Sequence, residues 1–161
     1  MSDHFPGSIE IGGELPRAKL EEFIAALTND GPGLGAVYEE GGATEEEYRR
    51  FIENDESRTG SITFSDPEAR YGMFDNIEPF CAANDLVFVR RSSSHHEFDA
   101  ELVWSTPNLD NHVTVWANGD GEVLIKLEKL VGLLEFTYPT RMLKRLIAEN
   151  TPPTVPPFVV K

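Results

Sequence analysis

The sequence has few of the features on which several classes of protein depend. It contains one cysteine, Cys81, so no disulfide can form within the chain. It has no run of about 18 apolar residues, the length that a membrane-spanning helix needs. Its opening stretch, residues 1–13, has neither a basic start nor an apolar segment typical of a secretory signal. These absences predict a cytoplasmic protein that does not enter a membrane.

Basic residues are also scarce. The chain has 14 Lys and Arg against 28 Asp and Glu, a formal net charge of −14. The imbalance is concentrated in residues 1–56, which hold 14 acids and 4 bases, whereas residues 57–161 hold 14 acids and 10 bases. Binding to phosphate groups requires Lys and Arg, so direct contact with nucleic acid or an anionic membrane is not expected. Such a chain instead attracts basic surfaces.

What the sequence does contain suits one folded domain. Forty per cent of the residues are hydrophobic, which is enough to form a single core. Residues 1–150 are predicted to form one α+β domain, and the proline-rich residues 151–161 an extended tail. In the first half, strands are expected at 8–11 and 61–64. Helices are expected from about Pro16 to 29, from about Thr44 to 53 and from about Phe74 to 84.

The second half of the chain has the alternating pattern of strands. Strands are predicted at 86–90, 97–104, 112–117 and 122–128, which together form a four-stranded antiparallel meander. A helix at 139–150 should close the domain with Leu143, Leu146 and Ile147 inward. The fold expected is therefore α+β, one antiparallel sheet with about four helices packed mainly on one face. Residues 7–30 and 60–85 share a strand–helix pattern, which indicates either a duplicated unit or chance.

The densest group of chemically reactive side chains lies in residues 95–101, HHEFDAE. On a strand, His95, Glu97 and Asp99 share one face, at spacings of roughly 6.5–7 Å. Ligands of one ion lie about 2–2.5 Å from it, so a straight row cannot converge without help from another strand. The favoured interpretation is a solvated outer face, with no cofactor. The alternative is an enzyme with a metal or small-molecule site formed by His95, Glu97, Asp99 and His112.

Other catalytic signals are weak. Cys81 falls on the expected inner face of its helix, where a cysteine usually serves as a small buried apolar residue. The sequence has no nucleophile elbow, phosphate-binding loop, zinc pattern or dinucleotide-binding motif. A non-enzymatic protein is therefore favoured.

The predicted meander has apolar residues on both of its faces. Val113, Val115 and Ala117 share the expected core face, and Trp116 should lie opposite Leu124 on the reverse face. Either a helix covers this reverse face, or a homodimer partner or another protein does.

Eight acidic residues crowd into eighteen positions of the first third: Glu39, Glu40, Glu45, Glu46, Glu47, Glu53, Asp55 and Glu56. Carboxylates held on a rigid scaffold can imitate the phosphates of a nucleic acid. We therefore expect a non-enzymatic, acidic protein-binding module, with an inhibitor or immunity-type role. Its partner would be a protein with a basic surface, bound by these acids with Trp116 as an apolar anchor.

Overall fold

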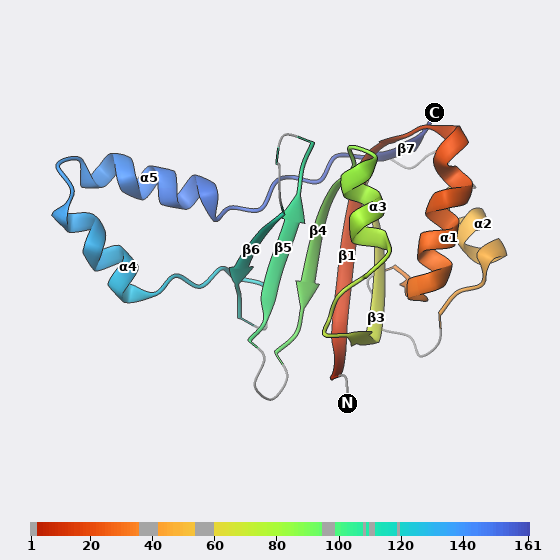
Figure 1. Cartoon of the computed structure of the whole chain (residues 1–161), viewed down its shortest axis with the longest axis horizontal. Coiled ribbons are helices and arrows are strands. Elements are labelled where there is room, and N and C mark those ends of the chain that lie inside the picture. The colour runs from red at the N-terminus through yellow and green to blue at the C-terminus, as the bar shows by residue number, and fades with distance from the viewer. Residues whose placement is uncertain are drawn as a thin grey trace.

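The computed structural model describes residues 3–35, 42–53, 60–94, 99–107, 109, 112–118 and 120–161. They form an α+β structure of seven strands and five α-helices, which confirms the predicted fold class (Figure 1). No helix in this described part is both long and apolar enough to cross a membrane.

The centre of the sheet is its first strand. β1 (His4–Leu15) pairs antiparallel with β3 (Ile62–Arg70) on one side and with β4 (Val87–Ser92) on the other. Beyond them lie β2 (Gly33–Leu34) next to β3, and β5 (Glu101–Ser105) and β6 (Val113–Trp116) next to β4. Ile9 and Ile11 of β1 are fully buried, as their alternation predicts, but the strand is far longer than the predicted 8–11.

Three helices cover one face of the sheet. They are α1 (Leu20–Asp30), which follows a 3₁₀ turn at Arg17–Lys19, α2 (Glu45–Glu53) and α3 (Ile77–Ala83). The main core lies between them and the sheet, and Phe23 of α1 stacks on Phe80 of α3 with 5.2 Å between ring centroids. Pro79 falls within the first turn of α3, where a missing N–H costs little.

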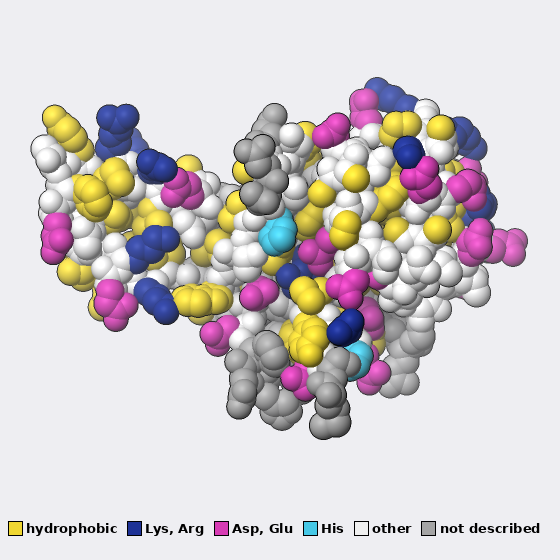
Figure 2. Space-filling model, viewed as in Figure 1, with side chains coloured by type: hydrophobic (Ala, Val, Ile, Leu, Met, Phe, Trp, Pro, Cys, Tyr) yellow, Lys and Arg dark blue, Asp and Glu magenta, His cyan; other side chains and the backbone are white. Residues whose placement is uncertain are grey.

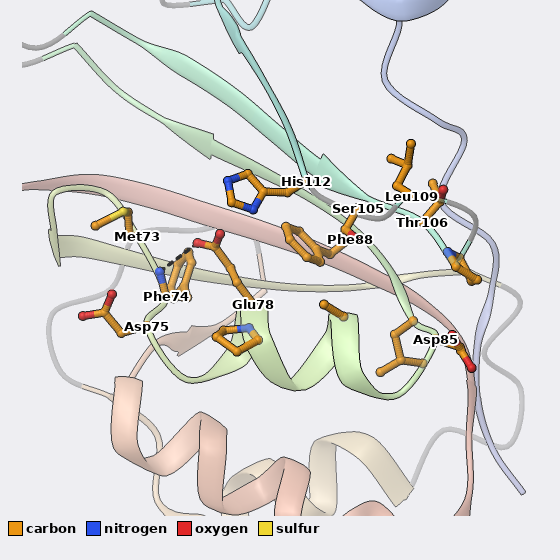
Figure 3. Close-up of a pocket in the computed structure, with 14 residues that line it drawn as sticks. Met73, Phe74, Asp75, Glu78, Asp85, Phe88, Ser105, Thr106, Leu109 and His112 are labelled. Carbon is orange, nitrogen blue, oxygen red and sulfur yellow. Dashed lines mark hydrogen bonds between the residues drawn. The ribbon is translucent and has the colours of Figure 1, made fainter.

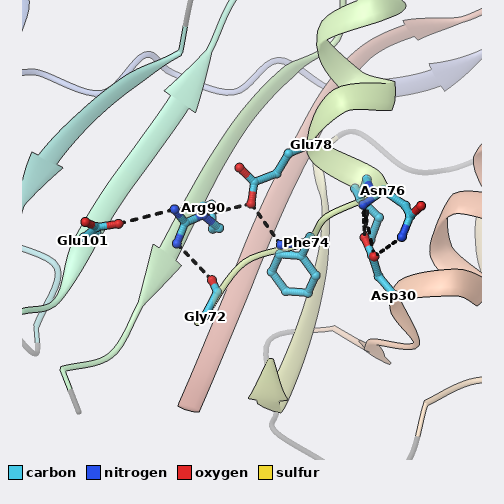
Figure 4. A network of polar contacts seen from close by, with 8 residues as sticks. Asp30, Gly72, Phe74, Asn76, Glu78, Arg90 and Glu101 are labelled. Carbon is cyan, nitrogen blue, oxygen red and sulfur yellow. Dashed lines mark hydrogen bonds and ion pairs between the residues drawn. The ribbon is translucent and has the colours of Figure 1, made fainter. Parts of the chain in front are cut away.

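Two polar arrangements fix the starts of helices. At α2 the predicted capping box is present, because the Thr44 N–H and hydroxyl both donate to the Glu47 carboxylate, at 2.8 and 2.7 Å. At α3 the cap comes from the end of α1. The Asp30 carboxylate accepts from the backbone N–H groups of Asn76 and Ile77, at 3.0 and 2.8 Å (Figure 4). The ends of α1 and α3 are therefore tied together.

The predicted fourth strand of the meander, at 122–128, is wrong. Only an isolated bridge joins Ala117 to Val123, and α4 (Leu127–Gly132) begins four residues after Val123. Val123, Ile125 and Leu127 alternate with the period of a strand. From Leu127 onward the apolar residues instead recur at the three- to four-residue spacing of a helix, at 127, 130, 131 and 134. The meander therefore has three strands, β4, β5 and β6.

A second, smaller cluster lies on the sheet face opposite the helices. It contains Val89, Leu102, Trp104, Val115 and Ala117, and Val155 from the proline-rich segment packs against it. After this crossing, β7 (Phe158–Val160) pairs parallel with residues 13–15 of β1. The proline-rich segment therefore ends as a strand of the sheet.

Candidate interaction surface

The C-terminal helices project away from the sheet instead of closing the domain (Figure 1). We call residues 126–150 the arm, and the rest of the chain the body. The arm contains α4, a 3₁₀ turn at Leu133–Glu135 and α5 (Pro139–Glu149). No arm residue belongs to either core cluster of the described structure, and within the arm Leu146 alone is buried. The prediction that Leu143 and Ile147 point inward is wrong, because both are exposed.

The arm carries most of the exposed apolar surface. Of the twelve large hydrophobic side chains exposed in the described part of the chain, nine lie between Trp116 and Ile147. Leu127 and Leu134 are 71% and 73% exposed, more than any others. Figure 2 shows hydrophobic side chains spread over the arm. The remaining arm members are Val131, Phe136, Tyr138, Leu143 and Ile147.

Two further apolar side chains lie where the arm leaves the sheet. The Leu124 N–H donates to the Trp116 carbonyl at 2.8 Å, so the two residues are paired as the sequence predicts. Trp116 is 44% exposed and Leu124 53%. Together with Lys126, whose ammonium lies 4.3 Å from the centre of the Trp116 ring, they line a groove of about 350 Å³. The groove continues onto Lys129 and Asn150 of the arm.

Trp116 lies on the helix-bearing face of the sheet. Directly paired residues of an antiparallel ladder point to the same side, and Trp116 pairs with Glu101 while Thr114 pairs with Val103. Val103 belongs to the main core beneath the helices. The face on which we expected the core, that of Val113 and Val115, instead carries the smaller cluster. The main core therefore lies on the face that Trp116 shares.

Arm and body carry opposite net charge. The arm has five of the 14 Lys and Arg but only three of the 28 Asp and Glu, which gives it a charge of +2 and leaves −16 on the body. Within the arm, Arg145 pairs with Glu149 at 2.6 Å. Arg141 and Lys144 are exposed on α5 beside Leu143 and Ile147. A cationic, apolar surface thus extends from a strongly anionic body.

Of the eight acidic residues predicted to bind a partner, the structure describes four, and three of these have contacts within the chain. Glu45 lies 3.5 Å from Arg49, and Glu53 lies 2.8 Å from Arg17. Glu47 caps its helix, which lowers the pKa of its carboxyl chiefly through hydrogen bonds from Thr44. Glu46 is exposed. The other four predicted acids, Glu39, Glu40, Asp55 and Glu56, lie outside the described residues.

A second cavity, of about 450 Å³, lies between α3 and the end of β5. Glu78 of α3 and His112, just before β6, point into it from opposite sides (Figure 3). Asp75, Asp85 and the apolar side chains of Met73 and Leu109 also line it. Carboxyl and imidazole groups are the side chains most used in acid–base catalysis, so this cavity is the arrangement closest to a catalytic site in the described structure.

Glu78 has a structural role that accounts for its position. Its carboxylate accepts from the Phe74 N–H at 3.0 Å, and Arg90 Nε lies 2.9 Å from the same oxygen, although not aligned for a hydrogen bond (Figure 4). Arg90, only 3% exposed, also donates to the Gly72 carbonyl at 2.9 Å and approaches Glu101 at 3.5 Å. Burial raises the pKa of Glu78 more than the Arg90 charge lowers it.

Of the alternative metal site, the structure describes only two residues, Asp99 and His112, and these two lie far apart. His95 and Glu97 lie outside the described residues. Asp99 precedes β5, whereas His112 lies opposite Ser105 at the other end of that strand. Six positions of an extended strand separate them, which is roughly 20 Å. The described residues contain no group of three His, Cys, Asp or Glu side chains that could hold an ion.

Cys81 is fully buried, as predicted, and burial raises the pKa of its thiol well above the usual value. The thiolate is the nucleophilic form of a cysteine, so this environment suppresses its reactivity.

The arm was missed in the sequence although a signal for it existed. Leu127, Leu130, Val131 and Leu134 recur at helical spacing immediately after the last turn of the meander. The ends of the helix predicted at 139–150 agree with α5 within about a residue, but the sequence did not predict that this helix is exposed. Comparison of the chain with protein-family models, with curated proteins and with solved structures finds no match.

Proposed function

We propose that this chain is a non-enzymatic protein-binding module, and that the arm together with Trp116 supplies its apolar contact surface. The proposal is carried by one observation: of the twelve large hydrophobic side chains exposed among the described residues, nine lie between Trp116 and Ile147. Scattered apolar residues are normal on a protein surface, but a contiguous set of them usually marks an interaction site.

The energetics favour a partner for the arm. Fully burying one Leu, Ile or Val side chain is worth about 1.5–3 kcal/mol. Leu127, Leu134 and Ile147 forgo most of this gain in the isolated chain, because all three are more than half exposed. A partner that covered them would recover it.

The body sets the chemistry of other partners. Its charge of −16 disfavours nucleic acid and favours proteins with basic surfaces. An inhibitor or immunity-type role, in which the acidic body occupies the basic surface of a partner, agrees with this charge. Glu46 is the exposed acid of α2 best placed to contribute, since Glu45 and Glu53 lie near arginines and Glu47 caps the helix.

Binding is favoured over catalysis for two reasons. The His112–Glu78 pair is the best catalytic candidate, but the Arg90 ion pair already explains why Glu78 is buried there. The rival constellation of His95, Glu97, Asp99 and His112 is not supported either, because Asp99 and His112 lie at opposite ends of the β5–β6 pair.

The proposal is tested by retention of partners from an extract of the source cells. The tagged chain should retain a specific protein, either a foreign one or untagged copies of the same chain. The Val131→Glu/Leu134→Glu variant should no longer retain it. Both side chains are exposed, so the change should leave the fold intact. Val159→Glu is the control, because Val159 is an exposed valine of the body. A retained set that is identical for all three baits would contradict the proposal.

A further inference from the structure

The arm has an obvious candidate partner in the chain itself. We propose that the arm of one copy docks on the sheet of a second copy, on the face that carries Trp116 and Leu124, and that the two copies exchange arms reciprocally. The inference rests on the proposed function and names a second copy as the partner of the arm.

The receiving face presents apolar side chains that no described helix covers. α1, α2 and α3 pack on the main core, and no described helix lies over β5 and β6 (Figure 1). Trp116 is 44% exposed at this end of the sheet, next to the groove of about 350 Å³. On the same face follows the 450 Å³ cavity, with Met73, Pro79 and Leu109 in its lining. A helix with apolar side chains could be seated along this surface.

The arm extends too far from its own body to cover this face. Both of its ends, Lys126 and Asn150, lie at the edge of the groove. From there α5 runs for 11 residues, about 16 Å, to a tip that carries Leu134 and Phe136. Figure 1 shows that this tip points away from the sheet. The apolar residues of the tip are therefore exposed in the isolated chain, and a second molecule would bury them.

Charge identifies that molecule. On α5 the exposed apolar side chains Leu143 and Ile147 lie beside Arg141 and Lys144, so a partner that fits this part of the arm needs apolar surface with acidic groups around it. The cavity on the receiving face offers this combination, because Asp75, Glu78 and Asp85 line it together with its apolar residues. The groove beside Trp116 is lined by Lys126, Glu128 and Lys129, so the cationic part of the arm belongs at the cavity and not at the groove. The body as a whole carries −16 against +2 on the arm.

Reciprocal docking satisfies both surfaces at once. Each copy carries one arm and one receiving face, so a two-fold axis brings each arm onto the face of the other copy. The two contacts are then identical, and no arm is left exposed to recruit a third copy. A closed dimer is expected rather than a filament.

The test is the mass of the full-length chain in solution, measured by sedimentation equilibrium from about 1 to about 100 µM. The expected result is a species of twice the 18.0 kDa chain mass. Val131→Glu/Leu134→Glu should raise the dissociation constant at least about tenfold, because it places two charges in the apolar contact. Val131→Glu alone and Val159→Glu form a matched pair, one on the arm and one on β7, and only the first should weaken the dimer.

A second measurement locates the contact. Equal amounts of isotopically light and heavy chain are mixed and treated with a zero-length carbodiimide cross-linker. Mixed-isotope links from Lys129 or Lys144 to Asp75 or Asp85 are expected. Links confined to chains of the same isotope would overturn the exchange.

The outcomes separate this inference from the proposed function. A wild-type chain that is monomeric throughout, or a dimer that the arm variant leaves unchanged, overturns the inference. The chain could prove monomeric while the wild type retains a foreign protein that the arm variant does not retain. In that case the proposed function stands and this inference falls. If the chain is monomeric and retains nothing, both fall.

Discussion

A buried arginine joins the helical layer to the sheet. Arg90 of β4 meets Glu78 of α3 at 2.9 Å, the Gly72 carbonyl at 2.9 Å and Glu101 of β5 at 3.5 Å. Burying a charge is costly unless it is neutralised and hydrogen-bonded. The Glu78 and Glu101 carboxylates neutralise the guanidinium and the Gly72 carbonyl accepts from it, whereas Arg90 Nε has no aligned hydrogen bond. The pair therefore ties α3 and the preceding turn to the middle of the sheet, at the edge of the receiving face.

The raised pKa of Glu78 predicts a pH dependence of stability. Burial favours the protonated carboxyl, so folding raises its pKa above the ordinary 4.5. The stability that Glu78 contributes is then complete below the unfolded-state pKa and is lost as the pH rises through the folded-state value. Each unit of difference is worth about 1.4 kcal/mol. Glu78→Gln should remove this contribution.

The measurement is the free energy of unfolding in urea at about pH 5 and about pH 7, for the wild type and for Glu78→Gln. Other carboxyl groups titrate equally in both proteins, so the difference between them isolates Glu78. The wild type should lose more stability over this range than the variant. If the free energies of unfolding of the two proteins changed equally between the two pH values, the Arg90 charge and not burial would control the pKa of Glu78.

At the scale of elements, the end of the chain depends on the absence of a side chain at Gly12. A Cβ atom at this position would lie 1.8 Å from the Pro156 carbonyl oxygen and 2.8 Å from a Val155 methyl group. The proline-rich segment therefore crosses β1 in direct contact with its backbone. Phe158, which belongs to the main core, is held in place by this crossing and by the pairing of β7 with β1.

Gly12→Ala should consequently displace the C-terminal segment. We expect a loss of about 3 kcal/mol in the free energy of unfolding, since backbone cannot yield as a flexible side chain does. Gly60→Ala is the matched control, because a Cβ there meets nothing within 4 Å, and it should cost less than about 0.5 kcal/mol. Equal urea midpoints for the two variants would refute the account.

Local signals predicted most elements, but not how distant ones pack together. The Thr44–Glu47 capping box, the turn before Val123 and the helix at 139–150 depend on residues close in sequence, and all are present. The parallel pairing of β7 with β1 and the capping of α3 by Asp30 join segments far apart in sequence. Periodicity contains no information about such pairings.

The candidate surface was predicted in part for the same reason. Trp116 was identified correctly as an apolar residue opposite Leu124, because one turn separates the two. Whether a helix of the same chain covers them depends on the direction in which the arm leaves the sheet. An amphipathic pattern shows which side of a helix seeks apolar contact, but it does not show whether that contact lies within the chain or in another molecule.

At the scale of the whole molecule, the separation of charge predicts how self-association responds to salt. The +2 arm and the −16 body attract one another between copies, while the two bodies repel. Arg141→Glu/Lys144→Glu makes the arm acidic and should weaken the dimer strongly at low salt. At about 1 M salt the screening length falls to about 3 Å, so only close contacts remain.

The dissociation constants of the wild type and of Arg141→Glu/Lys144→Glu should therefore converge as salt rises from about 0.05 M to about 1 M. The variant Val131→Glu/Leu134→Glu should recover only in part at high salt, because salt screens its two added charges but does not restore the hydrophobic contact that it loses. Sedimentation equilibrium of the three proteins across this range distinguishes the two contributions. If the charge-reversed arm bound as well as the wild type at low salt, the attraction between arm and body would not guide the assembly, and its apolar side chains alone would account for docking.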